Sequence, residues 1–203
     1  MYGKLQCHIK KEEVNLKEYE TFEEARKAIF EFIEGKMLSQ IEVNQLHKKE
    51  RLTIILQLIS VIKYLHENNF VYRDLKPENI MIDQNKNLVL IDFDRMLNEN
   101  NVEKHTKDFS FDFIAPEISL GFLTNKSDIY SIGKIINYLF DDDELDFFKN
   151  SDLNFDEKLN IKTIISECTA NDPVERPPIN DVVINFVSFI IDENFILENI
   201  DPN

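Results

Sequence analysis

The sequence predicts an α+β fold that is mainly helical and carries one small β-hairpin. Apolar residues recur at the spacing of an amphipathic helix in long segments of the chain. Two short β-like runs lie on either side of a turn-rich stretch, which is typical of a hairpin. At 203 residues, the chain is long enough for one full-sized domain, or for one domain and part of a second.

The first half of the predicted fold holds a long helix and the hairpin. The helix covers 48–69, and five apolar residues share one of its faces: Leu52, Ile55, Leu56, Ile59 and Ile62. The two β-like runs follow at 79–82 and 88–91, with the turn-rich DQNKN between them. From 94 to about 114 no period is visible, so we expect a long loop there, and loops of this length are usually functional or disordered.

The second half is predicted to be helical. A helix over 127–140 aligns five apolar residues: Ile129, Ile132, Ile135, Ile136 and Leu139. Ser127 or Asp128 is the expected N-cap of this helix. Two more helices are expected near 156–168 and 179–191, separated by the Pro-rich NDPVERPP.

The composition narrows the classes of partner. The net charge is −15, from 38 acidic and 23 basic side chains, which disfavours binding to nucleic acid or to an anionic membrane. A few bases focused in a cleft can still hold a phosphate ligand. The N-terminus has no apolar signal core, and the most apolar window, 52–62, is too short to span a membrane. Cys7 and Cys168 match no metal spacing, so we expect a reducing, cytoplasmic setting.

One polar loop carries the residue types that phosphoryl transfer needs. It reads YRDLKPEN at 72–79. Phosphoryl transfer requires a positioned nucleophile and compensation of phosphate charge. Asp74 can accept or orient a hydroxyl proton, and Lys76 would lie on the same side of an extended loop and can neutralise the phosphate.

Two further residues offer oxygen ligands for a metal ion. Asn79 ends the polar loop, and Asp92 follows thirteen residues later within IDFD, at 91–94. Magnesium is a hard cation that takes such ligands. The hairpin between the two residues would return Asp92 to the side of Asn79, so both can serve one metal ion.

With these residues in view, the chain resembles the eukaryotic-type protein kinases, whose pattern is H-R-D-L-x-x-x-N, then D-F-G, then A-P-E. The matching pieces are YRDLKPEN at 72–79, DFD at 92–94 and APE at 115–117. SDIYSIG at 127–133 and ERPP with Arg176 resemble two later motifs of the family. The resemblance covers roughly residues 29 to 191 and implies a protein-kinase-like fold, with a mainly helical C-lobe and a rudimentary N-lobe.

The resemblance implies a role for each matching residue. Asp74 would be the catalytic base and Lys76 would contact the γ-phosphate, while Asn79 and Asp92 would hold Mg²⁺. The implied cofactors are ATP and Mg²⁺. Lys76 within LKPEN is the serine/threonine-type signature, so the implied partner is a protein substrate with Ser or Thr acceptors.

The resemblance also implies regulation by phosphorylation. Arg73 beside Asp74 marks kinases whose activation loop is ordered through an Arg–phosphate pair. Thr106 and Ser110 lie in that loop and are the candidate sites for an upstream activating kinase, with solvated loop hydroxyls as the alternative.

Other matching residues read as structural. Asp128 is expected to hold the backbone of the catalytic loop, and Glu117 with Arg176 is expected to form a buried ion pair. The four histidines, at positions 8, 47, 66 and 105, show no ligand spacing and are expected in structural or surface roles.

Two substitutions lie inside the motifs. Tyr72 replaces the usual His and should keep its packing against Phe93. Asp94 replaces the glycine of D-F-G, which should restrict the loop and add negative charge beside the metal ion. We therefore expect impaired or altered switching of this loop.

The segment before the helical body matches the family least. AIFEFIEGKML at 28–38 resembles the last N-lobe strand and hinge, which would make Phe30 the gatekeeper and the backbone from Glu31 to Ile33 the contact for adenine. Lys10 is the candidate ATP-orienting lysine, with an ordinary exposed lysine as the alternative. No G-x-G-x-x-G is found in the sequence.

A local pattern competes with that hinge. Thr21 and Glu24 form a capping box ahead of an apolar face, so 21–34 can instead be a helix. The domain organisation expected from the resemblance is an N-lobe remnant and hinge over 1–34, a kinase-like C-lobe over 35–192 and a tail over 193–203.

Three functions compete on this sequence. The first is a serine/threonine protein kinase that uses ATP and Mg²⁺. The second is a catalytically dead kinase-like binding module, favoured by Asp94 and by the missing glycine-rich loop. The third, a small-molecule phosphotransferase, is disfavoured because LKPEN and APE are marks of protein kinases.

Overall fold

The computed structural model describes residues 35–98, 112–119, 122, 124–141, 145–146 and 152–190. The chain divides into two compact units, Met1–Gly35 and Lys36–Asn203, and every element described below lies in the second unit. Among these described residues, no helix has both the length and the apolar character needed to cross a membrane. The competing helix over 21–34 lies outside the described residues, as do residues 28–34 of the strand and hinge expected over 28–38. The rest of that expected segment contains a short strand, Lys36–Met37.

The second unit is mainly helical with two small antiparallel sheets, so the expected α+β class is confirmed. Its described α-helices are α2 (Lys48–Glu67), α3 (Pro116–Ser119), α4 (Asn125–Leu139), α5 (Phe155–Cys168) and α6 (Ile179–Ile190). Its strands are β1 (Lys36–Met37), β2 (Phe70–Val71), β3 (Ile80–Ile82), β4 (Leu88–Leu90) and β5 (Leu97–Asn98). Short 3-10 helices are η1 (Leu38–Gln40), η2 (Val43–Gln45), η3 (Pro77–Asn79) and η4 (Pro173–Glu175).

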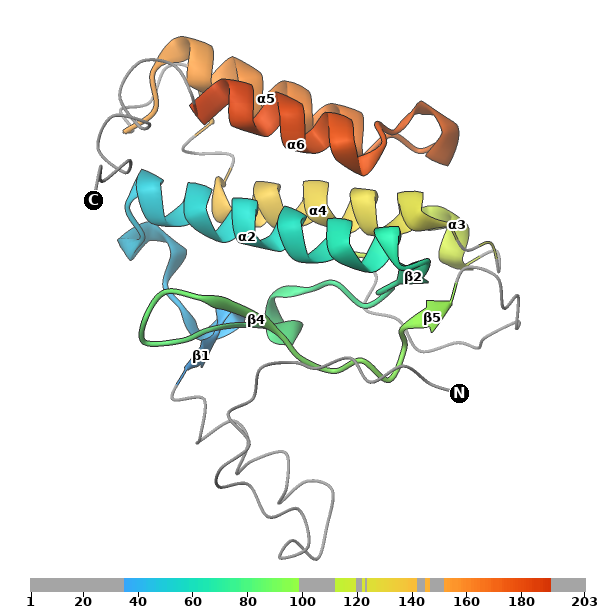
Figure 1. Ribbon diagram of the computed structural model, residues 1–203. Helices are drawn as coiled ribbons and strands as arrows, with labels where there is room; N and C mark the ends of the chain where they lie inside the picture. The colour runs from blue at the N-terminus through green and yellow to red at the C-terminus, as the bar shows by residue number, and fades with distance from the viewer. Residues whose placement is uncertain are drawn as a thin grey trace, which may run out of the picture. The chain divides into compact units, whose positions relative to one another are not determined.

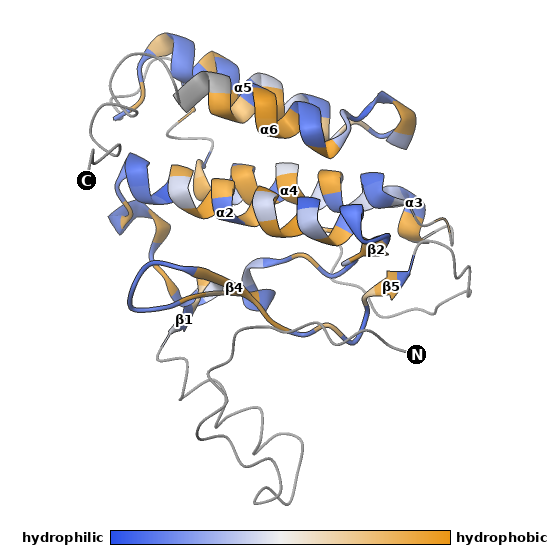
Figure 2. Ribbon diagram, in the orientation of Figure 1, coloured by the Kyte–Doolittle hydropathy of each residue, from blue (hydrophilic) through white to orange (hydrophobic). Residues whose placement is uncertain are grey.

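The helices stack in two layers. Figure 1 shows α2 and α4 side by side, with α5 and α6 covering them on one side and the strands lying on the other. Hydrophobic residues run along α2, α4 and α6, whereas the turn between β3 and β4 is hydrophilic (Figure 2). The main apolar core therefore lies between the helical layers, and the polar loops gather on the side of the strands.

Helix α2 forms where the apolar period predicts it. His47 is its N-cap, and the His47 backbone N–H donates to the Glu50 carboxylate at 3.1 Å. Its buried face is Leu52, Ile54, Ile55, Leu58, Ile59, Ile62 and Leu65. The helix ends at Glu67, and Asn69 then adopts a positive φ of 61°, which Asn tolerates better than most residues.

Helix α4 confirms the predicted helix but not its predicted start. The helix begins at Asn125 with Thr124 as N-cap, so Ser127 and Asp128 lie inside the first turn and the expected N-cap was wrong. The side chains of Ser127 and Asp128 are buried and bind other segments of the chain. Helices α5 and α6 are confirmed over 155–168 and 179–190.

Helix α4 packs closely against the end of α5. A Cβ added to Gly133 would lie 2.7 Å from Cβ of Cys168 and 2.8 Å from Cγ2 of Thr169, closer than side-chain atoms tolerate. A glycine is thus required where the two helices touch. Cys168 itself is fully buried, and burial raises the pKa of its thiol to about 12.

The hairpin is confirmed and is attached to α2 by one side chain. Strand β3 pairs with β4 antiparallel, with Met81 opposite Val89, and β1 adds on the far side of β3. The Gln57 side chain accepts from the Leu88 N–H at 2.5 Å and donates to the Lys86 carbonyl at 3.2 Å. This contact fixes the hairpin relative to the helix, and the polar loop 72–79 precedes the hairpin directly.

The loop expected from residue 94 begins with a turn and then contains a short strand. Leu97 and Asn98 form β5, which pairs with β2 so that Phe70 faces Asn98 and Val71 faces Leu97. This part of the prediction was wrong, because a two-residue strand leaves no period for sequence analysis to detect. Residues 99–111 lie outside the described residues.

Candidate active site

The polar loop 72–79 lies between β2 and β3 and is anchored from α4. Both oxygens of the buried Asp128 accept backbone hydrogen bonds, from the Tyr72 N–H and from the Arg73 N–H, each at 2.8 Å. Arg73 has a φ of 74°, in the left-handed region that few residues occupy. Asp128 thus holds the backbone immediately before Asp74, as the resemblance to kinases implied, and stabilises an unusual backbone conformation there.

A third donor to Asp128 comes from α2. Nε2 of His66, whose side chain is 5% exposed, lies 2.9 Å from Oδ2 of Asp128. A carboxylate only accepts, so Nε2 must carry the hydrogen. Sequence reasoning gave His66 a structural or surface role without a partner, because Asp128 is 62 residues away. A contact of this range leaves no local signal in a single sequence.

Asp74 is buried and its two carboxylate oxygens differ. Oδ2 accepts a hydrogen bond from Nδ2 of Asn79 at 2.9 Å and lies 3.1 Å from Nζ of Lys76. The same Asn79 nitrogen also donates to the Asp74 carbonyl at 2.8 Å. Oδ1 is buried and, within the part of the chain that the structure describes, has no hydrogen-bond partner. Such an oxygen is costly unless it serves a ligand.

The structure brings Asn79 next to the segment that carries Asp92. The Ile91 N–H donates to the Asn79 backbone carbonyl at 3.0 Å, which ties the end of β4 to the polar loop 72–79. Asp92 follows directly with an exposed side chain and a φ of 66°. The Asn79 side-chain nitrogen donates to Asp74, which leaves the side-chain oxygen, Oδ1 of Asn79, as the candidate ligand atom. One amide oxygen and one carboxylate are donors that fit Mg²⁺.

Tyr72 links the core to this segment. Its ring meets Phe93 edge to face at 5.6 Å between centroids, as expected for an aromatic residue in place of His. Its hydroxyl also donates to the Ile91 carbonyl, a contact that the sequence did not reveal. Burial, and then the nearby carboxylates, raise the pKa of Tyr72, so the phenol stays protonated and remains a donor.

Two arginines complete the surroundings of Asp74. Nε of Arg95 lies 3.8 Å from Oδ2 of Asp74. Nη1 of Arg73 donates to the Arg95 carbonyl at 3.2 Å. Burial, and then the charge of Arg95, lower the pKa of Arg73 from its usual value. Sequence reasoning did not single out Arg95, since it follows the motif at a position where the family pattern specifies nothing.

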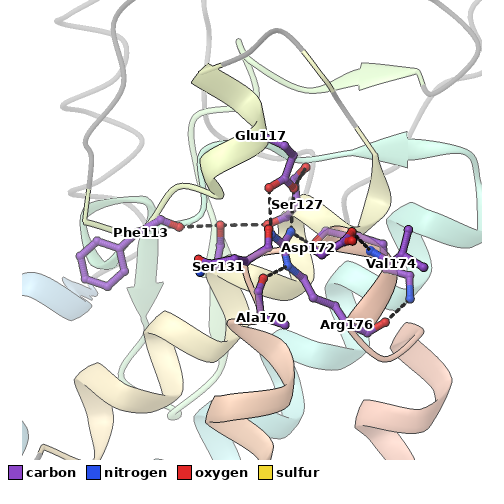
Figure 3. A network of polar contacts seen from close by, with 10 residues as sticks. Phe113, Glu117, Ser127, Ser131, Ala170, Asp172, Val174 and Arg176 are labelled. Atoms are coloured by element: carbon purple, nitrogen blue, oxygen red, sulfur yellow. Dashed lines mark hydrogen bonds and ion pairs between the residues drawn. The ribbon is translucent and has the colours of Figure 1, made fainter.

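The Glu117–Arg176 ion pair is confirmed (Figure 3). The pairing is bidentate, with Nη1 to Oε1 at 2.6 Å and Nη2 to Oε2 at 2.8 Å, and both residues are buried. Arg176 also donates through Nε to the Ala170 carbonyl at 2.8 Å. Its guanidinium lies 4.9 Å from the centre of the Tyr130 ring. This pair joins α3 to the loop after α5 and lies outside the polar loop 72–79.

Hydrogen bonds complete the surroundings of Glu117. Ser127 donates to Oε1 at 2.8 Å, in addition to Nη1 of Arg176, while Oε2 accepts from Nη2 of Arg176. Both carboxylate oxygens of Glu117 therefore have donors. Burial raises the pKa of Glu117, but hydrogen bonds from Arg176 and Ser127 outweigh it and hold that pKa below its usual value of 4.5. Ser131 donates to the Phe113 carbonyl at 2.7 Å, which ties the end of the long loop to α4 (Figure 3).

Several predicted residues lie outside the described residues. They are Lys10, Phe30, Glu31 and Ile33 of the expected nucleotide site, and Thr106 and Ser110 of the expected activation loop. Within the described part of the chain, no group of three or more His, Cys, Asp or Glu side chains could hold a metal ion.

Comparison with known proteins agrees with this geometry. The model of the protein kinase domain family matches residues 6–195. A probable serine/threonine-protein kinase KIN1 homolog of Encephalitozoon cuniculi is 35% identical over 150 residues, covering 68% of this chain and 26% of that protein. Serine/threonine-protein kinase PrkC of Bacillus subtilis is 38% identical over 115 residues, covering 53% of this chain and 18% of that protein.

A second KIN1 homolog, from Enterocytozoon bieneusi, is 36% identical over 134 residues, covering 60% of this chain and 22% of its own length. The chain thus aligns with about a quarter or less of each of these relatives. The family model covers most of the sequence, and its range includes the motifs at 72–79, 92–94 and 115–117. The chain belongs to the protein kinase family.

Proposed function

We propose that this chain is a serine/threonine protein kinase that transfers the γ-phosphate of ATP to Ser or Thr hydroxyls of a protein substrate. The observation that carries the proposal is the state of Asp74. Its carboxylate is buried and held through Oδ2 by Asn79 and Lys76, while no described residue hydrogen-bonds to Oδ1. An acid in this state is prepared to receive one more hydrogen bond.

In the proposed reaction, the acceptor hydroxyl donates to Oδ1 of Asp74. Asp74 orients this hydroxyl and takes its proton as the oxygen forms a bond to the γ-phosphorus. The bond between that phosphorus and its bridging oxygen breaks, and ADP leaves. Lys76, now paired with Asp74, would turn its ammonium to the γ-phosphate and offset the negative charge that develops there.

Asn79 and Asp92 are proposed to hold Mg²⁺ through the Asn79 side-chain oxygen and the Asp92 carboxylate. The ion, when bound, supplies charge compensation for the ATP phosphates. Asn79 has a second role in this proposal, because its Nδ2 fixes the Asp74 carboxylate and thereby its direction toward the acceptor. Lys10 and the backbone from Glu31 to Ile33 are proposed to contact ATP.

The wider setting of the protein is part of the same proposal. Residues 35–192 would form the C-lobe, 1–34 an N-lobe remnant with the hinge, and 193–203 a tail. An upstream kinase would phosphorylate Thr106 or Ser110, and the phosphate would pair with Arg73. The acidic composition and the cysteine usage support a cytoplasmic protein that binds neither nucleic acid nor membrane.

The test compares the full chain with its Asp74→Asn variant, using labelled ATP, Mg²⁺ and a generic Ser/Thr substrate. Loss of the base should lower phosphate transfer by about 100-fold or more. Lys86→Gln, in the exposed turn of the hairpin, is a matched control that should keep full activity. Equal incorporation by the chain and the Asp74 variant, or none by either, would rule out catalysis by this chain.

A second candidate function is a kinase-like binding module without catalysis. Asp94 favours it, because an exposed carboxylate stands where the family has glycine, two residues after the proposed metal ligand Asp92. Asp94→Gly distinguishes the two functions. In a kinase this change should preserve or raise phosphate transfer, whereas a binding module should show no transfer before or after it.

A further inference from the structure

The side chain of Gln57, on α2, binds the hairpin where β4 begins. Its Oε1 accepts a hydrogen bond from the Leu88 N–H at 2.5 Å, and its Nε2 donates to the Lys86 carbonyl at 3.2 Å. These partners fix the orientation of the amide, because an N–H only donates and a carbonyl only accepts. Both polar groups of this one side chain are therefore used by the same end of the strand.

The bond from Leu88 lies on the edge of β4 that faces away from β3. Among the described strands the sheet order is β1-β3-β4, so β4 is an edge strand. In an antiparallel pair, alternate residues direct their backbone groups toward the partner strand. The Asp83 N–H donates to the Asn87 carbonyl across the hairpin, so Leu88, the next residue, directs its N–H outward. Gln57 thus gives β4 a hydrogen bond on its outer edge.

The other end of β4 is bound to the polar loop 72–79. The Ile91 N–H donates to the Asn79 backbone carbonyl at 3.0 Å, and the Ile91 carbonyl accepts from the Tyr72 hydroxyl. Asp92 follows with a φ of 66°, and a residue other than glycine keeps such a conformation only where its surroundings hold the backbone. A strand of three residues is about 10 Å long. It is bound at both ends, and Asp92 lies directly beyond it.

We propose that Gln57 is a positioning residue for Asp92. The inference rests on the proposed function, which makes Asp92 a ligand of Mg²⁺. A strand attached only at its far end can pivot there, whereas the second attachment, at Gln57, fixes its direction. Loss of the Gln57 amide should therefore widen the range of positions that the Asp92 carboxylate occupies. Mg²⁺ demands near-ideal ligand geometry, so its affinity should fall when this ligand is less well held.

A second side-chain link between α2 and the hairpin provides the control. Nζ of Lys86 lies 3.0 Å from Oε1 of Glu50, and the two side chains are 64% and 30% exposed. An ion pair with this exposure contributes little. Lys86→Gln removes the pair but keeps the backbone carbonyl that Gln57 binds. Both links join the same two elements, so a comparison of their loss isolates the contribution of the Gln57 amide.

The first measurement is hydrogen exchange of single amides, followed by NMR on the full chain without nucleotide or metal. Gln57→Leu is similar in size and removes both bonds. It should speed exchange at Leu88 about tenfold, because that amide loses its acceptor, and at Ile91 about threefold or more. Ile91 is decisive, since its own acceptor is unchanged. Lys86→Gln should leave both rates unchanged, and the Ile135 amide of α4 should keep its rate in both variants.

The second measurement is a Mg²⁺ titration with a non-hydrolysable ATP analogue, followed by the chemical shift of the Asp92 amide. The half-saturating Mg²⁺ concentration should rise about threefold or more in Gln57→Leu, less than when a direct partner of a ligand is lost. Lys86→Gln should match the wild type. Gln57→Glu keeps an acceptor for Leu88 but loses the donor, so it should fall between. If circular dichroism shows that Gln57→Leu is unfolded, Gln57→Glu decides by the same two measurements.

Faster exchange at Leu88 alone would overturn the proposal, because the role of Gln57 would then be local. So would an equal acceleration at Ile135, which reports global unfolding, or an unchanged Mg²⁺ affinity. Weaker Mg²⁺ binding by Gln57→Leu, with no phosphate transfer by the wild type, would refute the proposed function and keep this inference. Transfer by the wild type and by Gln57→Leu with the same Mg²⁺ dependence would do the reverse.

Discussion

Two buried acids of this chain are held in opposite ways. Both oxygens of Glu117 are occupied, by the two guanidinium nitrogens of Arg176 and by Ser127. Asp74 is at least as deeply buried, but only its Oδ2 has partners among the described residues. A fully satisfied carboxylate contributes rigidity, whereas a partly satisfied one keeps capacity for a ligand at some cost in stability.

The largest effect should come from breaking the satisfied pair. Arg176→Met leaves the Glu117 carboxylate buried without its cation and should lower the free energy of unfolding by about 3–5 kcal/mol. Urea unfolding followed by circular dichroism measures it. Arg176→Lys keeps the charge but loses the bidentate geometry, and should fall between the wild type and Arg176→Met. A loss below about 1 kcal/mol for Arg176→Met would contradict the structural role of the Glu117–Arg176 pair.

A smaller effect is expected at Asp128, where His66 is the only donor from a side chain among the described contacts. His66→Phe should cost about 1–3 kcal/mol, because a charged acceptor in the interior loses one hydrogen bond. Since Asp128 also holds the backbone before Asp74, the turnover rate should fall more than the affinity for ATP. His66→Gln can still donate from its amide and should recover part of both losses. Equal unfolding free energies and equal turnover rates of His66→Phe and His66→Gln would show that the hydrogen bond to Asp128 contributes nothing.

Asp74 itself should contribute little to stability. Asp74→Asn removes a carboxylate with one unpartnered buried oxygen, so the free energy of unfolding should change by no more than about 1 kcal/mol. The matched change Glu117→Gln should cost clearly more. Thermal unfolding of both variants under one condition makes the comparison. A large loss in Asp74→Asn would mean that the acid is a structural element like Glu117.

The smallest effect concerns pH. The pKa of Glu117 is lowered in the folded protein, so its contribution to stability is present above the unfolded value of about 4.5 and is lost as the pH falls through the folded pKa. The difference in unfolding free energy between the wild type and Glu117→Gln should therefore narrow as the pH falls below 4.5. A difference that stays constant from pH 7 to pH 3 would contradict the assigned direction of this pKa shift.

Sequence patterns predicted the parts of the molecule that depend on local period. Helices α2 and α4 to α6 and the β3–β4 hairpin lie where apolar spacing and turn residues indicated. The family pattern also anticipated the Glu117–Arg176 pair and the anchoring of the catalytic loop by Asp128. These contacts join distant segments, and only the resemblance to kinases made them foreseeable.

The misses share a physical cause. Ser127 or Asp128 was the expected N-cap because both are polar and precede an apolar run, yet the helix begins earlier, with Thr124 as its N-cap. The His66 contact, the β2–β5 pairing and the place of Arg95 each depend on segments that meet only after folding. Secondary-structure propensity and hydrophobic period describe residues that are near each other in the sequence. They therefore do not reveal contacts between distant segments.

The tight contact between α4 and α5 has one practical consequence. The Cys168 thiol is fully buried against the turn that carries Gly133, and its pKa of about 12 keeps it protonated. Alkylating reagents attack the thiolate, so Cys168 can react only after the two helices separate. The rate at which Cys168 is labelled should therefore report how often α4 and α5 separate. Peptide mass spectrometry distinguishes Cys168 from Cys7.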